Sequence, residues 1–155
     1  MERRSFLATI AAGLGLASAA GSAEGGFEVT RSKAEWKAML GDMEYRVMRE
    51  EGTEPPYSSP LNDEKRAGTY HCKGCEQALY SSEHKFDSGT GWPSFWQALP
   101  GAIGTKTDWK LIYPRTECHC SRCGSHLGHI FDDGPEPTGK RHCINGVALE
   151  FRPQA

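Results

Sequence analysis

The chain has 155 residues, of which 37% are hydrophobic and 25% charged, which is enough for one soluble domain with a modest core. Its formal net charge of -2 gives no basic surplus, so the composition argues against nucleic acid or an anionic lipid surface as a partner. Eighteen glycines and nine prolines indicate many turns, and therefore short strands.

The N-terminus has the features of an export signal: a charged start, an apolar middle and a small-residue end. Arg3 and Arg4, with the apolar run that follows them, resemble the twin-arginine signals that send folded proteins across the bacterial inner membrane. We therefore expect residues 1–23 to be a cleaved signal and residues 24–155 to form the mature periplasmic domain, without stable membrane association. An uncleaved membrane anchor is the alternative, but the apolar run 6–20 is shorter than the ~20 residues of a spanning helix.

Two short helices are predicted at the start of the domain. Ser32, with Glu35 three residues later, has the spacing of a capping box before a helical run. Asp42 is the expected N-cap of a second helix, and Gly52 the expected left-handed residue that ends it.

The rest of the chain has the pattern of antiparallel strands, because its apolar segments are short and bounded by turn residues. In an extended strand, the side chains of Arg141, Cys143 and Asn145 would share one side with the apolar side chains of residues 147–151. This parity predicts that Cys143 faces inward. The predicted strands have the sequences GTYHC, ALYSSE, KLIYPRTECHC, HIFDD and GVALEFR.

Four of the six cysteines form two matching C-x-x-C pairs, Cys72 with Cys75 and Cys120 with Cys123. Four thiolates complete a tetrahedral shell, so the pairs predict one structural Zn²⁺ per chain, with no position open to water. In an exported protein two disulfides are the alternative, although a two-residue gap makes a strained ring. The twin-arginine route lets the metal load in the cytoplasm before export.

Cys143 stands apart from these pairs. A single cysteine on an apolar parity is often an inert, buried side chain. An ordinary thiol is also mostly protonated at pH 7, and the adjacent guanidinium of Arg141 would raise the reactive thiolate fraction. The residues alone therefore leave both readings of Cys143 open.

Four blocks of the sequence occur in the order found in B-type methionine-R-sulfoxide reductases: GTYHCKGC, FDSGTGWPSF, CSRCGSHLGHIFDDGPEPTG and RHCIN. The resemblance covers roughly residues 36–151. It implies a mainly β, Mss4-like fold, in which two antiparallel sheets form a rolled, barrel-like tent with short N-terminal helices and a zinc site remote from the active site. The implied activity is repair of oxidative damage: reduction of the R epimer of methionine sulfoxide, protein-bound or free.

The resemblance also implies roles for individual residues. Cys143 would attack the sulfoxide sulfur and become a cysteine sulfenic acid. His129 would protonate the sulfoxide oxygen with His126 as its helper, although histidines in a β domain are often plain hydrogen-bonding residues. Trp92 resembles the wall that selects the substrate methyl group; a core aromatic is the simpler reading.

The same resemblance implies secondary roles for three further residues. Asn145 would hold the substrate oxygen or orient a histidine, and Asp133 would hydrogen-bond a histidine ring from behind the site. Arg141 would favour the Cys143 thiolate, with a surface salt bridge as its simpler reading. Phe95 and Phe131 are expected in the core or lining the pocket.

Recycling of the catalytic cysteine departs from the family pattern. Many relatives have a resolving cysteine at the position of Thr90, and a threonine cannot form a disulfide. Either an external thiol, such as a thioredoxin-like protein, reduces Cys143 directly, or Cys118 serves instead. Strand parity places Cys118 on the same side as the zinc ligand Cys120, which favours the external thiol.

Two other functions fit parts of the pattern. A zinc-ribbon binding module would use Cys143 for packing and its aromatic residues for recognition. A thiol-disulfide oxidoreductase would use one C-x-x-C pair, which bound zinc excludes.

Overall fold

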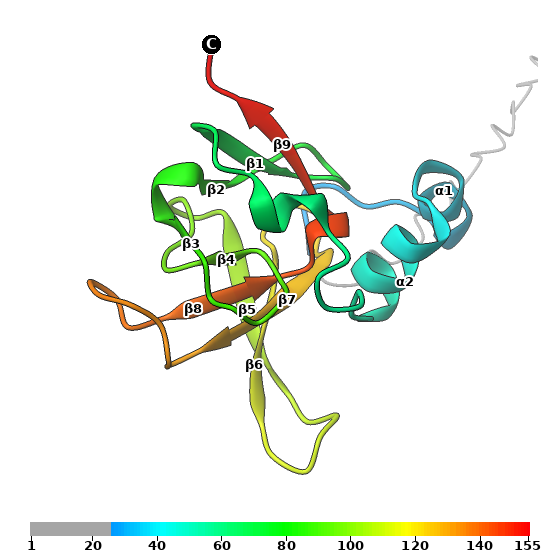
Figure 1. Ribbon diagram of the computed structural model, residues 1–155. Helices are drawn as coiled ribbons and strands as arrows, with labels where there is room; N and C mark the ends of the chain where they lie inside the picture. Colours follow the sequence, from blue (N-terminus) through cyan, green and yellow to red (C-terminus); the bar gives the residue numbers. More distant parts are fainter. Residues whose placement is uncertain (1–25) are drawn as a thin grey trace, which may run out of the picture.

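A computed structural model describes residues 26–155, so the expected export signal lies outside the described residues. This part of the chain forms two short helices and nine strands (Figure 1). None of these helices has the length and apolar character that a bilayer span requires. The elements are α1 (Lys33–Met39), α2 (Asp42–Glu50), β1 (Gly68–Cys72), β2 (Ala78–Ser81), β3 (Lys85–Phe86), β4 (Ser94–Phe95), β5 (Ile103–Asp108), β6 (Arg115–Cys120), β7 (His126–Phe131), β8 (Arg141–Ile144) and β9 (Leu149–Pro153), with 3-10 turns at Pro60–Asp63, Ser82–His84 and Gly146–Ala148.

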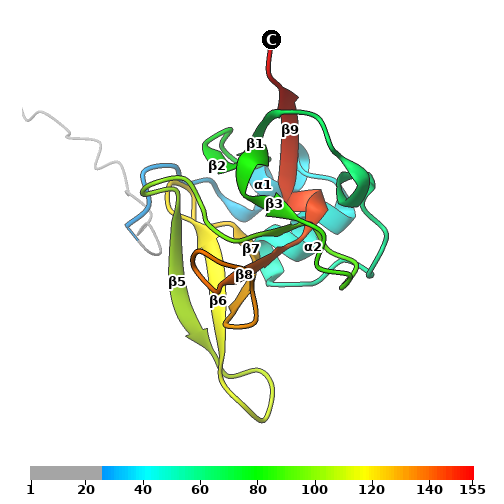
Figure 2. The ribbon, with the colours of Figure 1, turned by 60° about the vertical axis from the view of Figure 1, so that its left-hand side comes forward.

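The strands form two antiparallel sheets, with the orders β2-β1-β9 and β3-β4-β8-β7-β6-β5. Figures 1 and 2 show the smaller sheet at one end of the molecule and the larger one below it, and Figure 1 shows α1 and α2 at one side of the sheets. The mainly β class with short N-terminal helices is confirmed. Within residues 26–155 the two sheets stay separate and do not close into a barrel.

The predicted ends of the two helices are only partly correct. The capping box of α1 is present, because the Ser32 side chain accepts from the Glu35 N–H and the Glu35 side chain accepts from the Ser32 N–H. The prediction that Asp42 caps α2 was wrong: Gly41 is the N-cap, and Asp42 is already helical. The residue with left-handed backbone at the end of α2 is Glu51, not Gly52.

Strand prediction worked best where apolar residues alternate. β1 matches the predicted GTYHC, and β2, β7 and β9 fall within or overlap their predicted runs. β5 was missed because its sequence, IGTKTD, is polar and largely exposed. The predicted strand that begins at Lys110 starts only at Arg115, since residues 110–114 form the end of the β5–β6 hairpin.

A single core joins the helices to both sheets. Trp36 of α1 and Val47 and Met48 of α2 are buried against it. Burying an apolar side chain of this size stabilises a fold by roughly 1.5–3 kcal/mol. The remaining large members of the core include Tyr70, Leu79, Tyr80, Phe95, Leu127, Ile144 and Leu149.

The predicted parity around Cys143 was wrong. In β8 it is His142 and Ile144 that are buried, whereas Arg141 and Cys143 on the other face are partly exposed. The parity does not continue to β9, because the turn Gly146–Ala148 intervenes and β9 belongs to the other sheet. Cys143 therefore faces away from the core.

Candidate active site and zinc centre

The two C-x-x-C pairs come together at the ends of strands from different sheets. Cys72 ends β1 of the smaller sheet and Cys120 ends β6 of the larger one. All four sulfurs lie within 4.8 Å of one another, and all four residues are buried. The cluster therefore spans the two sheets.

The spacing of these sulfurs fits zinc. Sulfur–sulfur distances are 3.7 Å for Cys72 and Cys123 and 3.5 Å for Cys75 and Cys120. A tetrahedron with Zn–S bonds of about 2.3 Å has edges of about 3.8 Å. The six cysteines are free thiols, with no disulfide in either pair. The expected structural zinc site is thus confirmed, and its buried four-sulfur donor set leaves no ligand position for substrate.

Cys143 lies in a separate cavity of about 230 Å³. Cys143 on β8 pairs directly with His129 on β7, so the two side chains share one face of the larger sheet. Gly128, beside His129, has no room for a side chain, since a Cβ would lie 1.9 Å from the Cys143 carbonyl oxygen. The cavity is lined by Thr53, Thr90, Trp92, Arg115, Gly128, His129, Phe131, Arg141, Cys143 and Asn145.

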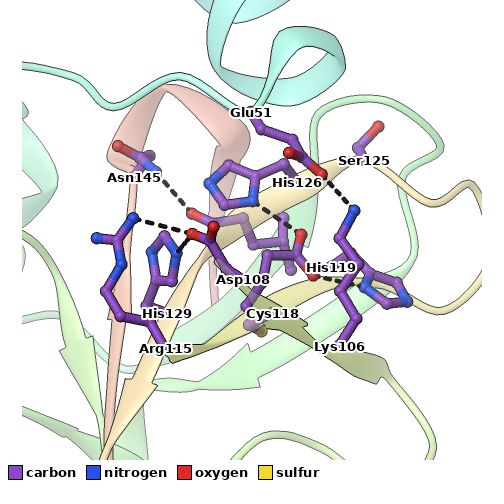
Figure 3. Close-up of polar contacts among 12 residues, drawn as sticks. Glu51, Lys106, Asp108, Arg115, Cys118, His119, Ser125, His126, His129 and Asn145 are labelled. Carbon is purple, nitrogen blue, oxygen red and sulfur yellow. Dashed lines mark hydrogen bonds and ion pairs between the residues drawn. The ribbon is translucent and has the colours of Figure 1, made fainter. Parts of the chain in front are cut away.

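His129 is held from the neighbouring hairpin. Its Nε2 hydrogen-bonds Asp108 Oδ2 at 2.8 Å, and Arg115 donates to the same oxygen at 2.9 Å (Figure 3). Burial lowers the pKa of His129 below its ordinary value, although the bond to Asp108 opposes this. The imidazole is therefore neutral at pH 7, with one nitrogen fixed by a carboxylate.

His126 lies behind His129 and is not among the residues that line the cavity. Its Nδ1 bonds Glu117 at 2.8 Å, and its ring centre is 5.4 Å from that of His129. Burial alone would raise the pKa of Glu117, but hydrogen bonds to His119 and His126 lower it to about 2. The buried Glu117 thus fixes the orientation of His126.

Arg141 lines the cavity and is itself held in place. It pairs with Asp133 through bonds of 2.9 and 3.1 Å and lies over the Phe131 ring. Burial raises the pKa of the Cys143 thiol above its ordinary value, and the positive charge of Arg141 only partly offsets this. The expected influence of Arg141 has the predicted direction, but Cys143 is a thiol rather than a thiolate at neutral pH.

Asp133 does not have the predicted contact with a histidine ring. Its carboxylate bonds Arg141 at the surface, and the carboxylates that bond the site histidines are Asp108 and Glu117. Asp133 and both histidines belong to the same sequence motif. The histidines lie on β7, however, and their side chains contact residues of the neighbouring hairpin instead of Asp133. Asp108 and Glu117 lie on β5 and β6, so only the sheet pairing reveals these partners.

Trp92 and Asn145 both line the cavity and are tied to one residue that the sequence did not indicate, Glu54. The indole of Trp92 donates to the Glu54 carbonyl at 3.0 Å. The Asn145 amide oxygen accepts from the Glu54 N–H at 2.9 Å, and its NH₂ group donates to the Leu127 carbonyl. Asn145 therefore bonds backbone and not a histidine.

The Glu54 side chain is also part of this arrangement. It is 1% exposed, and it accepts from the backbone N–H groups of Gly146 and Val147, in the turn after Cys143. Burial raises its pKa. A buried carboxylate next to two prolines has no periodic or motif signal, which is why sequence reasoning missed it.

Comparison with known proteins agrees with this geometry. Residues 40–153 match the family model described as the SelR domain. The chain is 50% identical over 125 residues to "Peptide methionine sulfoxide reductase MsrB" of Methanosarcina barkeri, covering 80% of this chain and 88% of that one. It is 48% identical over 128 residues to the protein of the same name from Pseudomonas putida, covering 82% and 96% of the two chains.

A solved structure gives a weaker likeness. The Mis18 "Yippee-like" domain is similar with a TM-score of 0.45 and 15% identity, over 58% of this chain and 99% of that one. The family model, in contrast, spans the zinc cysteines and every residue that lines the cavity. This chain belongs to the SelR-domain family of B-type methionine sulfoxide reductases.

Proposed function

We propose that this protein reduces the R epimer of methionine sulfoxide, free or within a protein, to methionine. The observation that carries the proposal is the Cys143 thiol directly opposite His129, in a cavity with Trp92 and Phe131 among its walls. The aromatic walls suit a methyl thioether, and the polar groups suit a sulfoxide oxygen.

The chemical step needs no outside proton. The Cys143 sulfur attacks the sulfoxide sulfur and forms a transient sulfur–sulfur bond. The oxygen then bonds to the Cys143 sulfur while its bond to the methionine sulfur and the sulfur–sulfur bond break, so Cys143 becomes a sulfenic acid and methionine leaves. The sulfoxide oxygen gains the proton that the thiol loses.

His129 is placed to carry that proton. A Cys143 pKa raised by burial keeps the thiol protonated at pH 7, and a lowered His129 pKa keeps the imidazole neutral. A neutral imidazole can accept the thiol proton as attack begins and then donate it to the sulfoxide oxygen as this oxygen is transferred. His126 would support the His129 ring, and Asp108 would stabilise the transient imidazolium.

Chiral product analysis tests the proposal. The purified protein is given each methionine sulfoxide epimer with dithiothreitol, and methionine is measured. We expect turnover of the R epimer alone. Equal rates on both epimers would contradict the proposal, and no turnover of either would favour the zinc-ribbon binding module. The zinc itself would supply a structural crosslink between the two sheets.

We also propose that an external thiol, such as a thioredoxin-like protein, recycles Cys143. Two reducing thiols return the sulfenic acid to a thiol and leave as a disulfide and water. Thr90 lines the cavity where a resolving cysteine would be needed, and Cys118 is fully buried elsewhere. The test is a sulfenic-acid trap after stoichiometric substrate without reductant. An adduct on Cys143 is expected, and a quantitative intramolecular disulfide would overturn the proposal.

We propose, finally, that residues 1–23 direct export by the twin-arginine route and that the mature domain, beginning near Glu24, is periplasmic. The charged start with Arg3 and Arg4 and the small-residue end support this. Changing both arginines to lysine should leave the protein in the cytoplasm. N-terminal sequencing of the periplasmic fraction checks the cleavage, and an intact Met1 there would count against it.

A further inference from the structure

The end of the β5–β6 hairpin exposes several large apolar side chains. Figures 1 and 2 show this hairpin projecting from the body of the molecule. Trp109 is 71% exposed, Ile112 is fully exposed, and Leu111 and Tyr113 are about half exposed. We call residues 109–113 the apolar tip. Contiguous exposed apolar side chains on a soluble domain indicate an interaction surface.

The apolar tip is connected to the cavity through the base of its own hairpin. Asp108 precedes the tip and bonds His129, and Arg115 follows it and lines the cavity. Asp108 and Arg115 also bond each other across the hairpin at 2.9 Å. The tip therefore begins at the residues that hold the reactive site.

Outside the apolar tip, one more exposed aromatic side chain, that of Tyr57, adjoins another part of the cavity wall. Tyr57 is 72% exposed. Its hydroxyl donates to the Gly89 carbonyl and its N–H to the Gly91 carbonyl, each at 2.7 Å. The turn between these glycines carries Thr90, which lines the cavity. Exposed apolar groups thus adjoin both the Arg115 part and the Thr90 part of the cavity wall.

The cavity is too small for more than one side chain. Its volume of about 230 Å³ is below the roughly 300–1,000 Å³ of sites that take drug-sized ligands. If a methionine sulfoxide side chain fills it, the polypeptide that carries this side chain must lie outside, over the rim.

We infer that the apolar tip, with Tyr57, binds an extended polypeptide that carries methionine sulfoxide between apolar neighbours. The inference rests on the proposed function and specifies its substrate. Charge favours a polypeptide over an anionic membrane, because the lysines at the hairpin are already paired: Lys106 and Lys110 both bond Glu51. The Glu51 carboxylate offsets one of these two charges, and the single positive charge that is left would attract anionic lipid by only roughly 1 kcal/mol.

The experiment compares two synthetic peptides, each with one methionine-R-sulfoxide, flanked by Leu and Val in one and by Ser and Gly in the other. The free amino acid amide is the third substrate. We expect the wild-type protein to prefer the apolar peptide by roughly tenfold in kcat/KM, the size of one or two interface contacts. In a triple variant, Trp109→Ser with Leu111→Ser and Ile112→Ser, this ratio should fall to about one, with the rate on the free amide unchanged.

The ratio of kcat/KM between the two peptides distinguishes loss of docking from damage to the active site. Met39→Ser, an exposed apolar residue on α1, is the matched control and should keep the wild-type ratio. An equal loss on all three substrates, or an unchanged ratio in the triple variant, would overturn the inference while the proposed function stands. A wild-type protein inactive on every substrate would overturn both.

Two further measurements exclude other occupants of the tip. Sedimentation of wild type and triple variant tests for a second copy of the chain, and flotation with phosphatidylglycerol vesicles tests for lipid. A monomeric protein that does not float is expected. Tip-dependent dimerisation or vesicle binding, with an unchanged peptide ratio, would replace the polypeptide as the occupant and overturn the inference.

Discussion

The four-cysteine cluster and the Cys143 cavity contain the same functional group in opposite settings. In the cluster, four buried sulfurs lie within 4.8 Å of one another, so all four can bind the same metal ion. Cys143 has no second thiol among the residues that line its cavity, but it lies opposite an imidazole. The number and kind of neighbours, and not the thiol itself, decide between a permanent crosslink and a reactive site.

The two settings also differ in how they use the sheets. The cluster joins β1 of one sheet to β6 of the other, and is therefore part of what holds the fold together. Cys143 lies on the outer face of the larger sheet, where β8 supplies the thiol and β7 the imidazole opposite it. Removing a sulfur should therefore destroy stability in one region and activity in the other.

Cys143→Ser should produce the largest effect on activity. Turnover of the R epimer should fall by roughly a thousandfold or more, because a hydroxyl is a far weaker nucleophile than a thiol at neutral pH. The midpoint of thermal unfolding should stay within a few degrees, since the change is nearly isosteric. A variant that keeps substantial turnover would contradict the assignment of Cys143.

Cys72→Ser should instead act mainly on stability, by removing one ligand of the zinc. Structural zinc sites contribute about 10–16 kcal/mol in small peptides, comparable with or above the whole stability of a domain. We expect loss of zinc by elemental analysis together with loss of cooperative unfolding. Cys118→Ser is the matched control, a buried cysteine on β6 outside the cluster, and should retain one zinc per chain. A wild-type protein without zinc when purified from the cytoplasm would contradict the assignment.

Glu54→Gln should have an intermediate effect. The amide can accept only one of the two backbone N–H bonds from Gly146 and Val147, and leaving a buried donor unpaired costs about 1–3 kcal/mol. Because Trp92 and Asn145 contact the Glu54 backbone at the cavity wall, we expect kcat/KM to fall roughly tenfold, mainly through KM.

Steady-state kinetics on the R epimer measure this effect. Glu76→Gln, which alters an exposed salt bridge with Arg152, is the control and should leave both constants unchanged. A Glu54 variant with lower thermal stability but wild-type KM would limit Glu54 to a structural role.

The zinc site and the Cys143 cavity differ in how far their residues could be predicted from the sequence. The zinc ligands were fully specified by spacing, because a C-x-x-C pair brings its own two sulfurs together and the two pairs need only meet. The cavity depends on pairing between distant strands. His126, His129 and Asn145 stand in recognisable motifs, but the residues that bond them, Glu117, Asp108 and Glu54, carry no motif signal.

The errors have one physical origin. The predicted parity of Cys143 requires one continuous strand, whereas the turn Gly146–Ala148 transfers the chain to the other sheet. β5 was missed because an exposed edge strand needs no apolar alternation. Local sequence pattern thus predicted β1, β2, β6, β7 and β9, but not the two-residue strands β3 and β4 or the strand β5 that supplies Asp108.

Alkylation by iodoacetamide should distinguish the two kinds of thiol directly. In the zinc-loaded protein we expect one adduct, on Cys143, since the other five cysteines are buried. Because burial raises its pKa, the rate should increase nearly tenfold per pH unit up to pH 9 without a plateau. Arg141→Ala removes a charge that lowers this pKa, so its rate at pH 8 should be severalfold slower. An alkylation rate that reaches a plateau near pH 7 in the wild-type protein would contradict the conclusion that Cys143 is a protonated thiol at neutral pH.

Cys118→Ser should have the smallest effect, because the sheet keeps Cys118 away from Cys143. Cys118 on β6 pairs with Gly128, whereas Cys143 on β8 pairs with His129, the next residue along β7. The two cysteines therefore lie on opposite faces of the sheet, with one strand between them.

Two strand spacings amount to about 10 Å, beyond the ~7 Å between Cα atoms that a disulfide allows. Cys118 is also fully buried beside the Tyr80 hydroxyl, and burial raises its pKa to about 12, so it supplies no thiolate to attack a sulfenic acid. Turnover of Cys118→Ser with dithiothreitol should stay within about twofold of wild type, with the same trapped adduct on Cys143. If the variant instead stalled after one turnover, Cys118 would be the resolving cysteine and the larger sheet would have to open in each cycle.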